Sequence, residues 1–267
     1  MKLRPVAGIM LRQFYLFTGS PVRVLPMFAW VAIDIVLWGF ITRYLDSVSD
    51  RRVDFLGRLL GAVLMWDFFT RIMQGVTTAF LEDIWSRNFL NLFATPLSIS
   101  EYLLGLIGTS IATSLLGLAV MLALATAVFG LSFFSLGLAL IPFLLTLFLF
   151  GIALGVIASA LVLRFGPASE WIVWPLPALL SPFVGVFYPL ATLPHWMQLV
   201  ARVLPPSYVF EAMRGMLSGA GLPLVSMLIA LALASIEIAL GAAIFVRVYR
   251  HVVRSGLLAR YSAESVG

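Results

Sequence analysis

Apolar residues fill long runs along this chain, and short polar segments separate the runs. Six of the runs come close to the roughly 20 residues that a helix needs to cross the hydrocarbon core of a bilayer. They cover residues 24–45, 55–80, 102–128, 136–163, 171–187 and 222–246. The pattern predicts an all-α integral membrane protein with six transmembrane helices, and it leaves no stretch for a separate soluble domain.

The composition supports this prediction. Of the 267 residues, 62% are hydrophobic and 11% are charged, whereas a soluble domain averages about 45–50% apolar and about 25% charged residues. The formal net charge of +5 comes from basic residues that lie mainly outside the apolar runs. This placement indicates anchoring at a membrane surface, so lipid and not nucleic acid is the expected partner of these charges.

The basic residues near the ends of the predicted spans also indicate an orientation. If both termini lie on one side, that side holds ten basic residues, namely Lys2, Arg4, Arg12, Arg23, Arg87, Arg164, Arg247, Arg250, Arg254 and Arg260. The other side holds six, namely Arg43, Arg51, Arg52, Arg58, Arg202 and Arg214. The excess places both termini in the cytoplasm, although the cluster from Arg51 to Arg58 argues against this orientation.

An amphipathic segment, residues 1–21, precedes the first span. Its apolar residues recur at helical spacing, and Arg4 and Arg12 occupy other positions. The segment is predicted to form an interfacial helix that lies along the cytoplasmic surface and ends at Gly19-Ser20-Pro21. A plain membrane anchor and a part in the mechanism both remain open for it.

The polar segment after the second span, residues 82–96, is predicted to form a short cytoplasmic helix. Acidic residues at its start suit the helix dipole, and its apolar residues exceed what a solvated loop needs. Such a helix fits either a hydrophobic groove on a partner protein or the lipid headgroups. The candidate contact residues are Glu82, Asp83, Trp85, Arg87, Phe89, Leu90, Phe93, Pro96 and Glu101.

Five prolines interrupt an apolar stretch between residues 181 and 206. Each proline removes a backbone donor, and irregular backbone inside a membrane is tolerated only where protein or water covers it. We therefore predict a re-entrant pair of half-helices over residues 188–218, on the outer side between the fifth and sixth spans. The candidate outer-gate residues are Gly185, Phe187, Tyr188, Pro189, Pro194, Pro205, Tyr208 and Arg214.

Four ionisable residues fall inside the predicted spans, where such residues are costly and usually face protein or water. They are Asp34, Asp67, Arg71 and Glu237. Asp67 and Arg71 are four residues apart and can pair along one helix face, whereas Asp34 has no obvious local partner. An ion-coupled transporter or channel that uses the three carboxylates is an alternative function, and broken helices would suit it too.

The chain carries no motif for catalysis. Its single lysine, Lys2, lacks the glycine-rich context of a nucleotide-binding P-loop. His195 and His251 lack metal-binding spacing, and there is no cysteine. We therefore expect that the chain is not an enzyme and holds no cofactor or metal.

Two stretches resemble the permease subunits of type 2 ABC (ABC-2) exporters. Residues 87–105, RNFLNLFATPLSISEYLLG, resemble the coupling helix of that family and the start of its third span. Residues 179–217 resemble the segment between its last two spans. The matching residues there are Gly185, Phe187, Pro189, Leu193, Pro194, Pro205, Tyr208 and Arg214. The order of an interfacial helix, six spans and a basic tail is similar as well.

The resemblance implies one transmembrane domain over residues 1–267, acting as the permease of an ATP-driven exporter in a bacterial cytoplasmic membrane. It implies a homodimer with a separate ABC ATPase subunit, which would hold Mg-ATP and dock on the helix at residues 82–96. The outer half-helices would cap the translocation path. Spans with few polar side chains favour a lipid-like, glycolipid or polysaccharide, or hydrophobic drug-like substrate, moved by alternating access.

Overall fold

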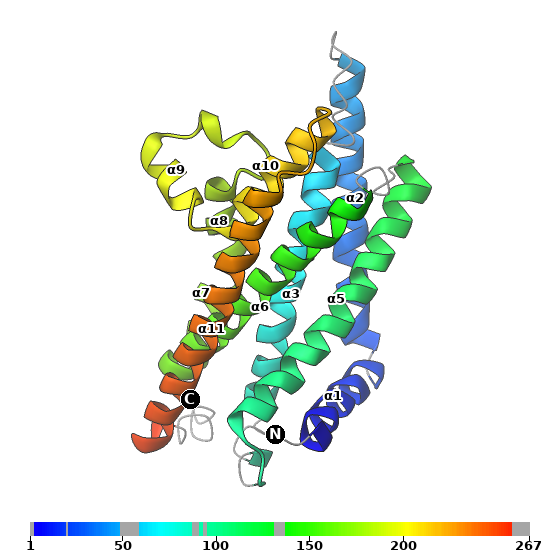
Figure 1. Ribbon diagram of the computed structural model, residues 1–267. Coiled ribbons are helices and arrows are strands. Elements are labelled where there is room, and N and C mark those ends of the chain that lie inside the picture. Colours follow the sequence, from blue (N-terminus) through cyan, green and yellow to red (C-terminus); the bar gives the residue numbers. More distant parts are fainter. Residues whose placement is uncertain are drawn as a thin grey trace.

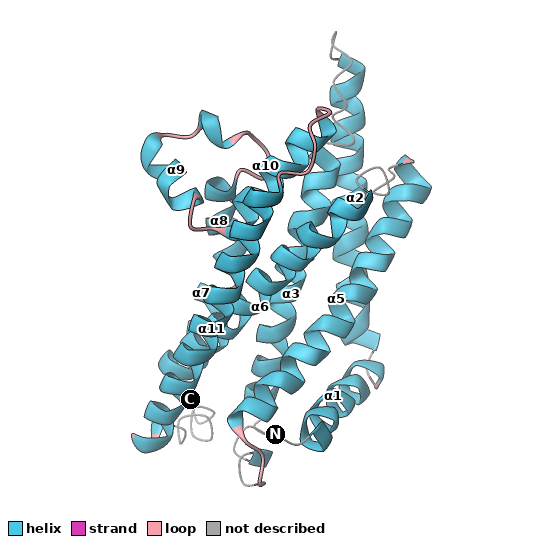
Figure 2. Cartoon of the chain, viewed as in Figure 1, coloured by secondary structure: helices cyan, strands magenta, loops and turns pink. Residues whose placement is uncertain are grey.

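The computed structural model describes residues 3–19, 21–48, 59–86, 91–92, 95–130 and 137–257. Within these ranges every regular element is a helix (Figure 1, Figure 2). The long helices are α2 (Pro21–Val48), α3 (Gly61–Trp85), α5 (Ile99–Phe129), α6 (Leu140–Phe165) and α11 (Leu224–Arg254). The short ones are α1 (Leu3–Thr18), η3 (Pro167–Ser169), α7 (Glu170–Val173), α8 (Leu176–Val184), η4 (Leu190–Thr192), α9 (His195–Ala201) and α10 (Pro205–Leu217).

The long helices run side by side, and both chain termini lie at the same end of the bundle (Figure 1). Helix α1 lies obliquely at that end and packs against α5. Helices α8, α9 and α10 gather toward the opposite end. Each end of the bundle therefore carries one candidate region. The first consists of α1 and the connection between α3 and α5, and the second is the proline-rich segment.

The core is built on α3, which packs against α6, and α6 packs in turn against α11. The rings of Phe69 and Phe150 stack between α3 and α6 with their centroids 5.3 Å apart. A Cβ atom added to Gly155 of α6 would lie 2.8 Å from the carbonyl oxygen of Met73 on α3. Small residues allow membrane helices to approach closely, so this glycine accounts for the tight contact between α3 and α6.

Three stretches of the described chain are long and apolar enough to cross a membrane, and they are Ile99–Phe129, Gly137–Phe165 and Leu224–Arg254. They correspond to α5, to α6 with the short turn before it, and to α11. Helices α2 and α3 are also long, with 28 and 25 residues, but they are not among these three stretches. The chain is thus a multi-pass helical membrane protein, and the number of six spans stays a prediction.

The predicted fifth span, residues 171–187, is two short helices in the structure. Helix α7 ends at Val173 and α8 begins at Leu176, with Pro175 between them. A proline suits the start of a helix, but it cannot donate the hydrogen bond that would continue the preceding helix. The break therefore occurs before the proline cluster that the sequence analysis emphasised.

Candidate functional site

The proline-rich segment that the sequence analysis places on the outer side turns where the sequence supplies helix breakers, and we call it the outer segment. Helix α8 ends at Gly185, whose φ of 65° lies in the left-handed region. Pro189 and Pro194 have extended backbone directly ahead of η4 and α9, and Pro205 occupies the first turn of α10. The prolines thus begin short helices, and the chain folds back toward α10 and α11.

Two charged side chains of α10 hold the end of α8 and the start of η4. The guanidinium of Arg214 donates to the carbonyl oxygen of Gly185 at 2.6 Å and pairs with the Glu211 carboxylate at 2.7 Å. The same carboxylate oxygen accepts from the backbone N–H of Leu190 at 2.7 Å. We call Gly185, Leu190, Glu211 and Arg214 the outer clamp. Glu211 is not among the sequence candidates, although its spacing of three residues from Arg214 is typical of a helical ion pair.

Three other predicted outer-gate residues, Tyr208, Tyr188 and Phe187, make contacts outside the outer clamp. The Tyr208 hydroxyl donates to the carbonyl oxygen of Arg202 at 2.8 Å, and the Tyr188 hydroxyl donates to that of Pro182 at 2.8 Å. Phe187 stacks on Trp38 of α2, with ring centroids 5.4 Å apart. The outer segment is therefore tied to itself by backbone carbonyls and to α2 by an aromatic pair.

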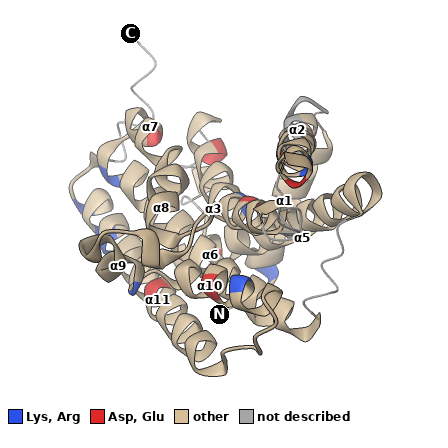
Figure 3. Cartoon of the chain, turned by 90° about the horizontal axis from the view of Figure 1, so that it is seen from above, with Lys and Arg blue, Asp and Glu red and all other residues tan. Residues whose placement is uncertain are grey.

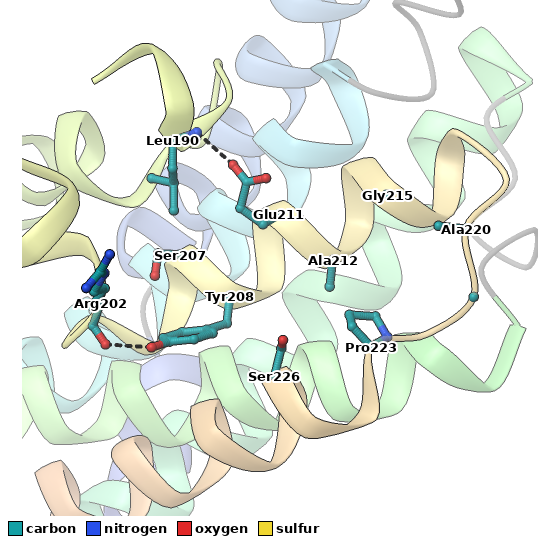
Figure 4. Close-up of a pocket in the computed structure, with 11 residues that line it drawn as sticks. Leu190, Arg202, Ser207, Tyr208, Glu211, Ala212, Gly215, Ala220, Pro223 and Ser226 are labelled. Atoms are coloured by element: carbon teal, nitrogen blue, oxygen red, sulfur yellow. Dashed lines mark hydrogen bonds between the residues drawn. The ribbon is translucent and has the colours of Figure 1, made fainter. Parts of the chain in front are cut away.

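A pocket of about 410 Å³ lies between η4, α10 and the start of α11 (Figure 4). Its wall includes Arg202, Tyr208, Glu211, Pro223 and Ser226. Tyr208 alone among the predicted outer-gate residues lines it. Its surface is mainly apolar, and Arg202, Tyr208 and Glu211 supply polar groups.

A buried polar cluster joins α1, α3 and α5 at the end of the bundle that holds both termini. Arg12 of α1 forms an ion pair with Asp83 of α3, whose side chain is 0% exposed. The Tyr102 hydroxyl of α5 donates to the other carboxylate oxygen of Asp83 at 2.8 Å. Burial raises the pKa of Asp83, and Arg12 and Tyr102 lower it in part. We call Arg12, Asp83 and Tyr102 the inner junction.

Helix α1 is fixed to the bundle by more than this ion pair. The Gln13 side-chain amide donates to the carbonyl oxygen of Ala79 on α3 at 3.3 Å, and Gln13 is fully buried. Ile9 packs against Gly105 of α5, where an added Cβ atom would lie 2.6 Å from the Ile9 side chain. The predicted interfacial helix is therefore docked on α3 and α5, and the sequence analysis did not identify these contacts.

The start of the predicted cytoplasmic helix belongs to α3. Glu82 and Asp83 were expected to open a separate helix, but α3 continues through Trp85 and ends at Ser86. The extension follows from packing, because Ile84 is buried at this end of α3. Trp85 donates from its indole nitrogen to the Glu170 carboxylate at 3.0 Å. The remaining candidates Arg87, Phe89, Leu90 and Phe93 lie outside the described residues.

Glu101 supports the start of α5. The Ser98 hydroxyl accepts from the backbone N–H of Glu101 at 3.3 Å, and the Ser98 N–H donates to the Glu101 carboxylate at 3.2 Å. This reciprocal capping box satisfies backbone donors at the helix start. Glu101 is 7% exposed, so it acts as a cap here, whereas Pro96 is exposed in the turn before it.

Three of the four intramembrane candidates come together between α2 and α3. Asp34 of α2 interacts electrostatically with both Asp67 and Arg71 of α3, and Asp67 interacts with Arg71. Glu237 of α11 shows no such interaction with them. When the bundle is seen from above, few charged residues lie on its helices (Figure 3). The tertiary structure therefore gives Asp34 the partners that its local sequence lacks.

These features define a multi-pass integral membrane protein. Its polar groups connect helices to one another, and many of them gather in the inner junction and the outer clamp. Within the described ranges, no group of three or more acidic or histidine side chains is placed to hold a metal ion. The family model of the ABC-2 type transporter matches residues 9–218. The chain therefore belongs to the ABC-2 type transporter family and is a permease of an ABC transporter, not itself catalytic. A search of curated proteins found no match.

Proposed function

We propose that this chain is the permease of an ATP-driven exporter in a bacterial cytoplasmic membrane, with both termini in the cytoplasm. Two copies would assemble with two ABC ATPase subunits, because permeases of this family work with such a subunit. Mg-ATP would bind to the ATPase subunits. The observation that carries the proposal is the family match over residues 9–218, which spans α1 to α10. It favours the exporter over the ion-coupled alternative.

The inner junction supports a route from the ATPase to the membrane helices. Residues 87–94, part of the predicted ATPase contact at residues 82–96, connect α3 to α5. The ion pair between Arg12 and Asp83 ties α1 to α3, and the Tyr102 hydrogen bond ties α5 to the same carboxylate. A push on this connection would therefore move α1, α3 and α5 together, and α3 lies at the centre of the core.

The outer clamp supports a gate at the opposite end. Its hydrogen bonds hold Gly185 and Leu190 against α10, and they break together if α8 moves away from α10. An export cycle would open this end once substrate is loaded. Lipid-like, glycolipid or polysaccharide, and hydrophobic drug-like substrates all fit the apolar interior.

The exposed face of α2 supports the homodimer. Helix α2 touches α5, and few of its described side chains are buried. Its large apolar side chains Trp30, Ile33, Leu37 and Phe40 are more than half exposed. A second copy of the chain would cover this face through the first and fifth spans, and lipid would cover what the second copy leaves.

Replacing Phe89 and Phe93 with aspartate tests ATPase docking. If these residues meet the ATPase, the change buries unpaired charge at an estimated cost of several kcal/mol. The variant should enter the membrane but lose the co-purifying ATPase subunit. The control is Val253→Asp, which adds charge at an exposed apolar position of α11 at the same end, and it should retain the subunit.

Transport by the purified and reconstituted complex distinguishes an ATP-driven exporter from an ion-coupled transporter. An exporter should take up substrate into inside-out vesicles only when ATP is hydrolysed. Uptake that follows an ion gradient and ignores ATP would establish the ion-coupled alternative. Retention of the ATPase subunit by the double aspartate variant would show that residues 89 and 93 do not form the contact.

A further inference from the structure

Helix α3 has a polar face that runs along most of its length. Every apolar side chain of α3 ahead of Trp85 is buried. The partly exposed positions follow one another at spacings that place them on one side of a helix. They are Asp67, Thr70, Arg71, Gln74, Gly75, Thr78 and Glu82. At 1.5 Å per residue this face extends about 22 Å, most of the roughly 30 Å of a bilayer hydrocarbon core.

The charges on this face are unbalanced where α2 approaches it. Asp34 adds a second carboxylate to the pair of Asp67 and Arg71. With all three ionised, the group carries one net negative charge. Two neighbouring carboxylates in a low-dielectric site oppose each other's ionisation, so a further positive charge stabilises the group. That charge can be a proton or a bound cation.

Two shielded polar atoms of the face also point to a ligand. One carboxylate oxygen of Asp67 and the hydroxyl of Thr70 have no hydrogen-bond partner among the described residues. Buried polar atoms in folded proteins nearly always have such a partner. The carboxylate oxygen and the hydroxyl oxygen are both acceptors, and they lie one turn apart on α3. Both oxygens carry negative charge or partial negative charge, so they favour a positive group beside them.

An aromatic surface lies one turn of α2 beyond Asp34. Trp38 is four residues after Asp34 and stacks on Phe187 with an interplanar angle of 13°. Phe187 is 42% exposed. Aromatic faces attract organic cations and cover apolar groups. Carboxylates beside an aromatic pair are the combination that recognises a positive group carried on an apolar body.

We propose that Asp34, Asp67 and Trp38 form a binding site for the positive group of an amphipathic organic cation, which the polar face of α3 guides through the apolar interior. This inference rests on the proposed exporter function and names its substrate class. An anionic group would meet two carboxylates, and a neutral glycan would leave the net charge uncompensated. A cation compensates the net charge and lies favourably against the oxygens of Asp67 and Thr70.

The test uses two hydrophobic ions of matched shape and opposite charge, tetraphenylphosphonium and tetraphenylborate. Binding of each to the purified permease–ATPase complex is measured by equilibrium dialysis. The phosphonium should bind saturably and the borate at least tenfold more weakly. Asp34→Asn should weaken phosphonium binding at least tenfold, and Asp34→Glu should restore most of it. The matched control is Glu237→Gln, which removes a carboxylate outside this group and should leave phosphonium binding unchanged.

The outcomes separate the two proposals. Equal binding of the two ions, or unchanged phosphonium binding in Asp34→Asn, overturns the cation site. If Asp34→Asn does not yield a folded complex, Trp38→Leu and the comparison of the two ions in the unaltered complex still decide the question. If the complex couples ATP hydrolysis to transport but shows no charge selectivity, the cation site alone fails. If no ATP-coupled complex forms, the exporter function fails.

Discussion

Replacing Arg12 with alanine should release α1 from the bundle, because the buried Asp83 carboxylate loses its cation. The Asp83 side chain is 0% exposed and that of Arg12 is 24% exposed, so the cost falls on a carboxylate that cannot reach water. Removal of one partner from a buried ion pair costs about 3–5 kcal/mol. Tyr102 keeps its 2.8 Å hydrogen bond to Asp83. We therefore expect the lower end of that range, on the order of a hundredfold in the opening equilibrium of α1.

Hydrogen–deuterium exchange measures this opening directly. Backbone amides of α1 should exchange on the order of a hundredfold faster in Arg12→Ala than in the unaltered chain. Arg4→Ala is the matched control, because Arg4 is an exposed arginine on the same helix. Adding Asp83→Asn to Arg12→Ala should recover much of the protection, since a neutral amide needs no cation.

The effect should also depend on pH. Burial raises the pKa of Asp83 in the folded chain, and loss of Arg12 would raise this pKa further. When the folded pKa exceeds the unfolded one, the free energy of unfolding is largest below the unfolded pKa and falls as pH rises through the folded pKa. Arg12→Ala should therefore be less destabilising at about pH 5 than at about pH 8.

Two results would refute the reasoning about the inner junction. The first is equal α1 exchange in Arg12→Ala and Arg4→Ala. The second is an Arg12→Ala effect that does not change between the two pH values. Either result would mean that apolar contacts such as those of Ile9 hold α1 without the ion pair.

The outer clamp and the start of α5 give further predictions. Arg214→Met removes the donor to Gly185 and the partner of Glu211. Transport into vesicles should therefore fall, while the ATPase subunit still co-purifies. Normal transport would show that the outer clamp is not a gate. Gly185→Ala should cost about 1–2 kcal/mol because its φ is positive, and thermal unfolding measures this loss. Ser98→Ala should cost about 1 kcal/mol through the lost cap of α5, whereas Ser100→Ala, which caps no helix, should be near neutral in the same assay.

The sequence by itself determined where helices form and where they break. Each of the six apolar runs overlaps a helix of the structure, because a long apolar run in a bilayer satisfies its backbone groups only within a helix. Pro189, Pro194 and Pro205 begin short helices because each lacks a backbone donor. The ABC-2 family membership also rests on sequence alone.

The tertiary structure alone decided which polar groups meet. Asp34 of α2 interacts electrostatically with Asp67 and Arg71 of α3, and Arg12 of α1 pairs with Asp83 of α3. In each case the partners lie on different helices. In a soluble protein the apolar face of a helix marks the side that packs inward. Lipid tails are as apolar as the protein core, so apolar spacing along a membrane helix cannot distinguish the packed face from the lipid face. The partner of a buried charge depends on which face of the helix packs against the protein, and only the packing of the helices determines that face.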